Sequence, residues 1–308
     1  MYKKYYHLTV SLISFIVIIP VIGIISNFEF QFSNLYNFFN NNYNIKIIYI
    51  TFIQAFLSAF FSCLIAIPFS LSLYRHRNLK IIKFIISLCG YSFVLPPILI
   101  IYSVIGIYGI NGFLNNITNY YELLNLNSIF GLKAILIAHI LLNTPFATRL
   151  LFQNLNTISK NYFEISNSIN LGFWSNIIKL EWPILKQNIL SIFSIIFVLC
   201  FLSFAIVMAL GGGPSTSTIE VAIYQSALFE LNFQKAIIFS FIQMFICLIF
   251  LIFGFYKLKG SNFFLTQNNY FNHPFKNHLY IKSFDYCFII LLSIILFSPI
   301  FYIISNFS

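Results

Sequence analysis

The sequence predicts an all-α protein, a polytopic bundle of membrane-spanning helices. Hydrophobic residues make up 59% of the 308 positions, charged residues only 8%, and the mean hydropathy is +0.88. A soluble domain of this length carries about 25% charged residues to keep its surface hydrated. The apolar residues also form long blocks, and a block of about 18 or more with few charges is typical of a membrane span.

Seven apolar blocks are long enough to cross a bilayer. They lie at residues 8–26, 47–73, 84–108, 133–152, 189–210, 234–256 and 285–305. The first block follows Lys3 and Lys4, as the apolar part of a signal peptide would. Its run is too long for that role, however, and Ile25-Ser26-Asn27 is not a small-x-small cleavage site. We therefore expect a retained first helix.

The lysines and arginines predict the orientation of these spans. If the N-terminus is cytoplasmic, only three of the 17 lie outside, namely Lys46, Lys133 and Lys235. The cytoplasmic side then holds the others: Lys3, Lys4, Arg75, Arg77, Lys80, Lys83, Arg149, Lys160, Lys179, Lys186, Lys257, Lys259, Lys276 and Lys282. Because positive residues concentrate in cytoplasmic loops, we expect a cytoplasmic N-terminus and an external C-terminus.

A weak internal repeat divides the chain. Residues 12–27 align without gaps on residues 291–306, with Pro20 on Pro299 and the same closing Ile-Ile-Ser-Asn. Transporters are often built from paired units, so one unit would end near residue 280 and a second would begin. We expect a first helix with an external loop (1–46), a membrane unit (47–256), and a linker with a last span that opens an incomplete second unit (257–308). Two similar helices arising by chance remain an alternative.

The polar stretch 153–188, between the fourth and fifth spans, is amphipathic. Apolar residues recur in it at near-helical spacing: Leu155, Ile158, Phe163, Ile165 and Ile169. A second helix is expected from about residue 173, and Pro183 should break it before the next span. Two short helices with a turn between them would then lie on the cytoplasmic face. A solvated loop would not need an apolar stripe, so we expect another molecule to cover it.

This segment resembles the cytoplasmic coupling motif of bacterial ABC importer permeases, which reads Glu-Ala-Ala, three residues, Gly, and Pro thirteen further on. The positions that match or flank this motif are Glu164, Ile165, Ser166, Asn170, Gly172 and Pro183. The spacing fits without gaps, but Ile165 and Ser166 replace the alanines and Asn170 replaces the turn glycine. Asparagine tolerates a positive φ, so the turn can still form. The resemblance implies that the segment docks on a separate ATPase subunit.

The resemblance extends over residues 130–256 and is closest to the thiamine-transporting members of this family. Its most specific part is the string Gly211-Gly-Gly-Pro214, followed by Thr218-Ile-Glu220. In those members two such units are fused. The resemblance thus implies a six-span type I ABC importer unit with one extra C-terminal span.

Two polar residues on the fourth span are candidates for the transport pathway. His139 and Asn143 are four apart and so share a helix face. Polar groups at this depth face the bundle or a pathway, and an interhelical hydrogen bond is the simpler explanation. We expect no catalytic residues, metal site or cofactor, because the acids lie mostly in loops and no cysteine pair forms C-x-x-C.

The resemblance implies that the chain is the permease subunit of an ABC importer in the bacterial inner membrane, and we do not expect an enzyme. The resemblance implies three partners besides the bilayer: an ATP-binding cassette ATPase, a solute-binding protein and a second permease unit. Nucleic acid is not expected despite the net charge of +10, because the charges follow the membrane sides. The implied cargo is thiamine or its phosphate esters. Alternatives are another small solute such as ferric iron, sulfate or polyamine, an ion-driven carrier or channel, or a truncated non-functional relic.

Overall fold

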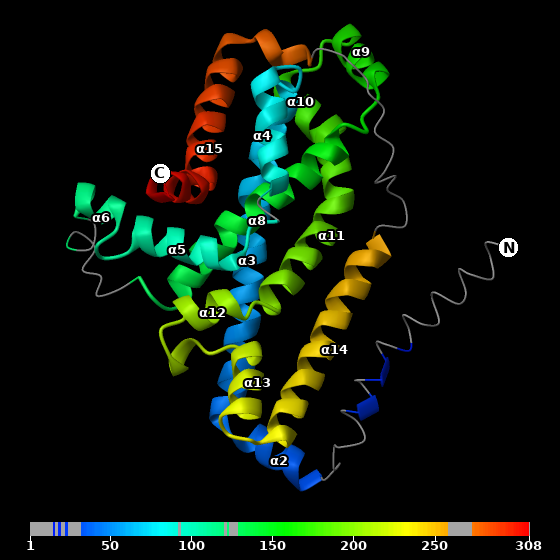
Figure 1. Ribbon diagram of the computed structural model, residues 1–308. Helices are drawn as coiled ribbons and strands as arrows, with labels where there is room; N and C mark the ends of the chain where they lie inside the picture. Colours follow the sequence, from blue (N-terminus) through cyan, green and yellow to red (C-terminus); the bar gives the residue numbers. More distant parts are fainter. Residues whose placement is uncertain are drawn as a thin grey trace, which may run out of the picture.

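The computed structural model describes residues 32–91, 94–119, 129–257 and 273–307, together with Glu122 and a few isolated positions before residue 32. This part of the chain is helical throughout, as predicted (Figure 1). The helices are α2 (Phe32–Asn40), α3 (Asn42–Arg75), α4 (Lys80–Tyr91), α5 (Pro97–Tyr108), α6 (Phe113–Thr118), α8 (Leu132–Leu155), α9 (Lys160–Ser168), α10 (Phe173–Asn176), α11 (Trp182–Phe201), α12 (Ala205–Leu210), α13 (Ile219–Leu228), α14 (Phe233–Lys257) and α15 (Leu279–Phe307). A π-helical turn spans Ile177–Glu181, and short 3₁₀ turns span Pro214–Thr216 and Pro274–Asn277.

Six helices in the described residues are long and apolar enough to cross a membrane. They are Asn42–Arg75, Pro97–Thr118, Leu132–Leu155, Phe173–Phe201, Phe233–Tyr256 and Leu279–Asn306. Their outward faces are apolar: on α14, for example, Phe245, Ile252 and Phe253 are at least half exposed. A soluble bundle would bury such side chains, whereas lipid covers them in a membrane protein. The predicted span at 8–26 lies almost wholly outside the described residues.

Helix α3 forms the centre of the bundle and packs against α8 and α11. Its small residues Ala55, Ala59, Ser62 and Ala66 are fully buried at helical spacing. Small side chains allow helix backbones to approach closely, which is the main source of packing between helices in lipid. The long helix α3 thus provides the surface on which the other spans assemble.

Two of the predicted spans are interrupted. The block 84–108 is not one helix, because α4 ends at Tyr91 and α5 starts at Pro97. Pro96 precedes α5 with an extended ψ of 136°, since a residue that is followed by proline is pushed out of the helical region. The block 189–210 is likewise broken at Leu202–Phe204, between α11 and α12. No glycine or proline lies at this second break, so no local signal in the sequence predicts it.

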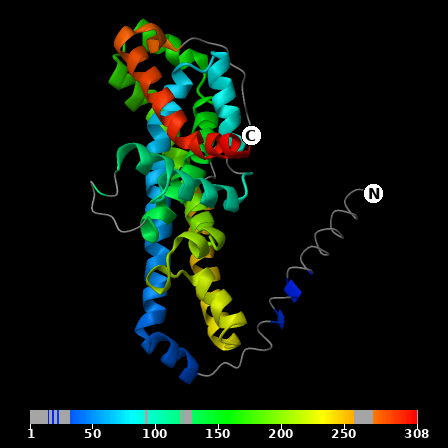
Figure 2. The same cartoon turned by 60° about the vertical axis from the view of Figure 1, so that its left-hand side comes forward.

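The two ends of the bundle differ in composition. One end gathers α9, α10 and the starts of α4 and α15; the opposite end gathers α2 and the start of α14 (Figures 1 and 2). The first end carries many of the positive residues that were assigned to one side by sequence, including Arg75, Lys80, Lys160 and Lys282. We call these the α9 end and the α2 end.

Candidate functional site

The amphipathic segment folds as two helices joined by a tight turn, as expected. Helix α9 ends in a Schellman motif: the Leu171 N–H donates to Ser166 O at 3.0 Å, and the Asn170 N–H donates to Asn167 O at 3.0 Å. This arrangement needs one residue in the left-handed region. Asn170 takes that position with φ +52°. The positive φ expected of Asn170 is therefore confirmed, and it fixes the angle between the two helices.

The second helix does not stop at Pro183, contrary to the prediction from sequence. Helix α10, the π-helical turn Ile177–Glu181 and α11 run on as one candidate span from Phe173 to Phe201. The wider π turn directly precedes the proline, with the Trp182 N–H donating to Ile177 O five residues back. Proline has no N–H and clashes with the carbonyl four residues earlier, and a π turn next to it accommodates the misfit. The segment is thus rigidly continuous with a membrane span.

The apolar stripe of the segment divides into two faces with different surroundings. Leu155, Ile158 and Phe163 are buried within the chain itself. Ile165 and Ile169, by contrast, are 58% and 62% exposed. The expectation that another molecule covers the whole stripe is therefore wrong for its first half, because the chain's own helices cover that half.

Exposed apolar side chains lie on both sides of the turn. Before the turn these are Tyr162 and Ile165 on α9 and Ile169 at its C-cap, which lie at i, i+3 and i+7. On the following helix Trp174 is 72% exposed and Ile178 is 61% exposed. We call these five residues the apolar patch. Large side chains exposed together beside charged residues mark a surface that binds another molecule.

The remaining motif positions have clear and separate environments. Glu164 is exposed and forms an ion pair with Lys160, Nζ to Oε1 2.8 Å. Ser166 is buried, and its hydroxyl donates to Asn176 Oδ1 at 2.8 Å, which holds the two helices together. Gly172 has an ordinary φ of −67°, and a Cβ there would meet nothing within 4 Å. The chain's own fold therefore does not require glycine at 172.

His139 and Asn143 lie in the middle of the bundle. The Ser58 hydroxyl on α3 is 3.1 Å from His139 Nδ1, so the interhelical hydrogen bond considered from sequence is present. The Asn143 amide nitrogen donates to His139 O at 2.9 Å and contacts Cys200 Sγ at 3.3 Å. Both residues also line a cavity of about 290 Å³, together with Pro97, Ser203 and residues beside them at the two helix interruptions. The sequence did not predict these helix interruptions or that they line a cavity beside His139 and Asn143.

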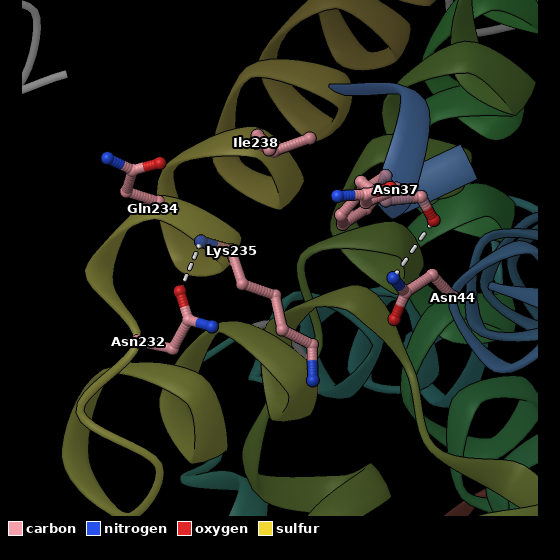
Figure 3. A pocket seen from close by; sticks show the side chains of 7 residues that line it. Asn37, Asn44, Asn232, Gln234, Lys235 and Ile238 are labelled. Carbon is pink, nitrogen blue, oxygen red and sulfur yellow. Dashed lines mark hydrogen bonds between the residues drawn. The ribbon is translucent and has the colours of Figure 1, made fainter. Parts of the chain in front are cut away.

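A second polar cavity of about 310 Å³ opens at the α2 end. Figure 3 shows its lining, in which the Lys235 side chain lies between Asn232 on one side and Asn37 and Asn44 on the other. Asn44 donates to Phe38 O at 3.0 Å, and Asn232 Oδ1 accepts from the Lys235 backbone N–H at 3.0 Å. The Lys235 ammonium is paired with Glu230 at 2.9 Å. Its charge is therefore already neutralised within the chain.

Sequence comparison relates the chain to known transport proteins. It is 35% identical over 263 residues to the thiamine transport system permease protein ThiP of Haemophilus influenzae, which covers 85% of this chain and 48% of that protein. The match to ThiP of Escherichia coli is also 35% identical, over 68% of this chain and 39% of the relative. The probable transport system permease protein NifC of Clostridium pasteurianum is 25% identical over 59% of the chain. No family model matches.

Solved structures share the fold. A chain of a bacterial alginate ABC transporter, crystallised in complex with an alginate-bound periplasmic protein, superposes with a TM-score of 0.65 over 84% of this chain and 94% of its own. A chain of the MetNI methionine ABC transporter in an inward-facing conformation superposes with a TM-score of 0.55 over 70% of this chain. Both are 16% identical, so they bear on the fold alone. The chain spans about half the length of the first curated relatives it matches.

Proposed function

Because this multi-pass membrane chain is an ABC importer permease, homologous to thiamine transport permeases over part of their length, we propose that it moves thiamine or its phosphate esters across the bacterial inner membrane. Permease subunits of such transporters are non-catalytic, and a separate ATPase supplies the energy. We propose that the chain works with that ATPase, with a solute-binding protein outside, and with a second permease unit.

The apolar patch is the observation that best supports a separate ATPase. Tyr162, Ile165 and Ile169 are exposed, whereas Phe163 and Ser166 are buried and hold α9 to the bundle. Since the second helix runs unbroken into a span, a push on the patch would be carried directly into the membrane region. We therefore assign ATPase coupling to Glu164, Ile165, Ser166, Asn170, Gly172 and Pro183, and place this end in the cytoplasm.

A crosslinking experiment tests the coupling role. Cys287 is the exposed native cysteine and the other four are buried, so a Cys287→Ser background leaves one reactive thiol per added cysteine. Ile165→Cys should crosslink to the cognate ATPase through a thiol-to-amine reagent. Ser166→Cys is the matched control, because it is the neighbouring residue and is buried. Absence of any Ile165→Cys crosslink with and without nucleotide, while the ATPase is present, would refute the assignment.

The central cavity supports a pathway through the bundle. Discontinuous helices near the middle of a membrane commonly form transporter binding sites, because their free backbone groups face the substrate. Here the cavity lies between the start of α5 and the break that separates α11 from α12, beside His139 and Asn143. We assign these two residues to the pathway.

Uptake into proteoliposomes tests the cargo. The chain, its ATPase, its binding protein and the second permease unit should accumulate thiamine only when ATP is present. Uptake of ferric iron, sulfate or polyamine instead would show that the chain belongs to an ABC importer with another cargo. Uptake that needs neither ATPase nor binding protein would favour an ion-driven carrier and overturn the proposal.

A further inference from the structure

Two sets of buried polar contacts lie at the α9 end beneath residues 153–188, which we call the coupling segment. In the first, the Arg75 guanidinium at the end of α3 donates from Nε to Asp285 Oδ2 at 2.7 Å, and its Nη2 also contacts Asp285 Oδ1. His76 Nε2 lies 3.1 Å from the same carboxylate. Arg75 is 5% exposed and Asp285 is 0% exposed. The first turns of α15 are therefore fastened to the end of α3.

The second set fastens the segment before α15 to the start of α11. His273 Nδ1 accepts from the Phe275 N–H at 3.3 Å, so Nε2 carries the proton and donates to Glu181 Oε1 at 2.9 Å. Glu181 is fully buried in the π-helical turn that precedes Pro183. We call the Arg75–Asp285 and His273–Glu181 pairs the base contacts.

Aromatic rings join the base contacts to the coupling segment itself. The Phe173 ring, at the start of the second helix of the segment, lies 5.4 Å from the Arg75 guanidinium carbon and 5.6 Å from the Phe275 ring. The Phe163 ring on α9 lies 5.0 Å from the His273 ring. Both helices of the segment thus rest on residues 273–285. Figures 1 and 2 show the start of α15 beside α10 in both views.

A buried ion pair is a poor way to stabilise a fixed contact between two elements. Replacing such a pair by well-packed apolar residues is often neutral or stabilising, because two charges must lose their hydration. In some proteins a buried ion pair supplies a defined register between the elements that it joins. This cluster is also incompletely satisfied: Arg75 Nη1, His76 Nδ1 and Glu181 Oε2 are buried with no hydrogen-bond partner among the described residues. Groups left over in one arrangement are available to pair in another.

We infer that the base contacts are positioning contacts that tie residues 273–285 to the coupling segment, so that movement of the segment is carried into α15. By the sequence repeat, α15 opens a second permease unit. The contacts would then link the motor-driven segment of one unit to the first helix of the next. This inference rests on the proposed function for the source of the movement, but the attachment itself does not.

The attachment is tested on the chain alone in lipid nanodiscs. In the Cys287→Ser background, spin labels at Ser168→Cys on α9 and Tyr280→Cys on α15 report the distance between the two elements; both positions are exposed. Asp285→Asn should broaden the distance distribution. Lys160→Gln is the matched control, because it breaks the exposed ion pair with Glu164 on the same α9 and should leave the distribution unchanged. An unchanged distribution in a folded Asp285→Asn protein overturns the inference.

Transmission is tested in the complex with the ATPase. Nucleotide should shift the label distance in the wild-type complex. The double variant Arg75→Met with Asp285→Leu replaces the ion pair by an apolar pair; it should keep the unfolding midpoint and lose the nucleotide-dependent shift. If the label distance in the double variant still shifts with nucleotide as in the wild type, the ion pair has a merely structural role and the inference is refuted. If the ATPase does not bind at all, the proposed function fails instead, while the nanodisc result still decides the attachment.

Discussion

Trp174 provides the sharpest test of the apolar patch. Its side chain is 72% exposed, and the ring contact that it makes among the described residues is with the neighbouring Phe173, at 5.5 Å between centroids. A tryptophan buries up to about 250 Å², so about 180 Å² remains for a partner to cover. At about 25 cal/mol per Å², full coverage would contribute about 4.5 kcal/mol as an upper bound. Truncation of an aromatic residue at the centre of an interface commonly weakens binding by about 2–4 kcal/mol.

We therefore expect Trp174→Ala to weaken binding of the cognate ATPase at least tenfold, which corresponds to about 1.4 kcal/mol. The unfolding midpoint should not change, because the side chain makes little contact within the chain. Trp182→Ala is the matched control: it is the second of the two tryptophans in the sequence and lies eight residues further along the same helix, closer to the membrane-spanning part. Affinity can be measured by interferometry with the chain immobilised in nanodiscs.

Fluorescence gives an independent measurement of the same contact. In a Trp182→Phe variant, Trp174 is the single tryptophan, and its emission reports its own surroundings. Docking of the ATPase should remove the ring from water and shift the emission to shorter wavelength. Equal affinities for Trp174→Ala and wild type, with no spectral shift at saturating ATPase, would show that the patch is not the docking surface.

Three further predictions concern the turn, the packing and the pathway. Asn170→Ala places an ordinary side chain at φ +52°, at a cost of about 1 kcal/mol. Hydrogen exchange of the Leu171 amide, followed by mass spectrometry, should therefore be about fivefold faster than in the wild type. Exchange in Asn170→Gly should not be faster, and the reverse order of the two variants would contradict the strain argument. Ala59→Leu overfills the fully buried contact of α3 and should destabilise by about 1–3 kcal/mol in thermal unfolding followed by labelling of the buried cysteines; an unchanged midpoint would mean that this contact is loose. His139→Phe should reduce transport. Ser58→Ala removes the same hydrogen bond but keeps the imidazole, so it should cost only about 0.6 kcal/mol of stability and leave transport intact. An equal loss of transport in both variants would reduce His139 to a packing residue.

The sequence was sufficient for features that depend on local chemistry. Long apolar blocks predicted the spans, and Asn170 predicted a positive-φ turn because few other residues adopt that conformation. It was insufficient where neighbouring elements decide the outcome. Pro183 is a helix breaker in isolation, yet a π turn accommodates it within a continuous helix. The break at Leu202–Phe204 has no local signal, because it arises where helices around the central cavity pack.

The apolar stripe of the coupling segment shows the same limit in another form. Helical spacing identifies which residues share a face, but it does not say whether that face turns toward the chain or away from it. Phe163 and Ile165 are two residues apart, and both belonged to one predicted stripe. In the fold Phe163 is buried near His273, a residue more than a hundred positions later, and Ile165 is exposed. The positions of Tyr74 and of residues 273–285, all remote in the sequence, decide between the two faces.

The boundary of the repeat and the boundary of the packed unit therefore differ. The repeat assigns α15 to the start of a second unit, and that division remains a prediction. In the fold α15 packs against α3, α5 and α8, and Asp285 is fully buried against Arg75. A buried arginine that lost this carboxylate would keep its desolvation cost without its partner, which is strongly destabilising. The base of the coupling segment thus depends on α15. If α15 opens a second unit, as the repeat predicts, two units joined in this way would not move independently at the α9 end.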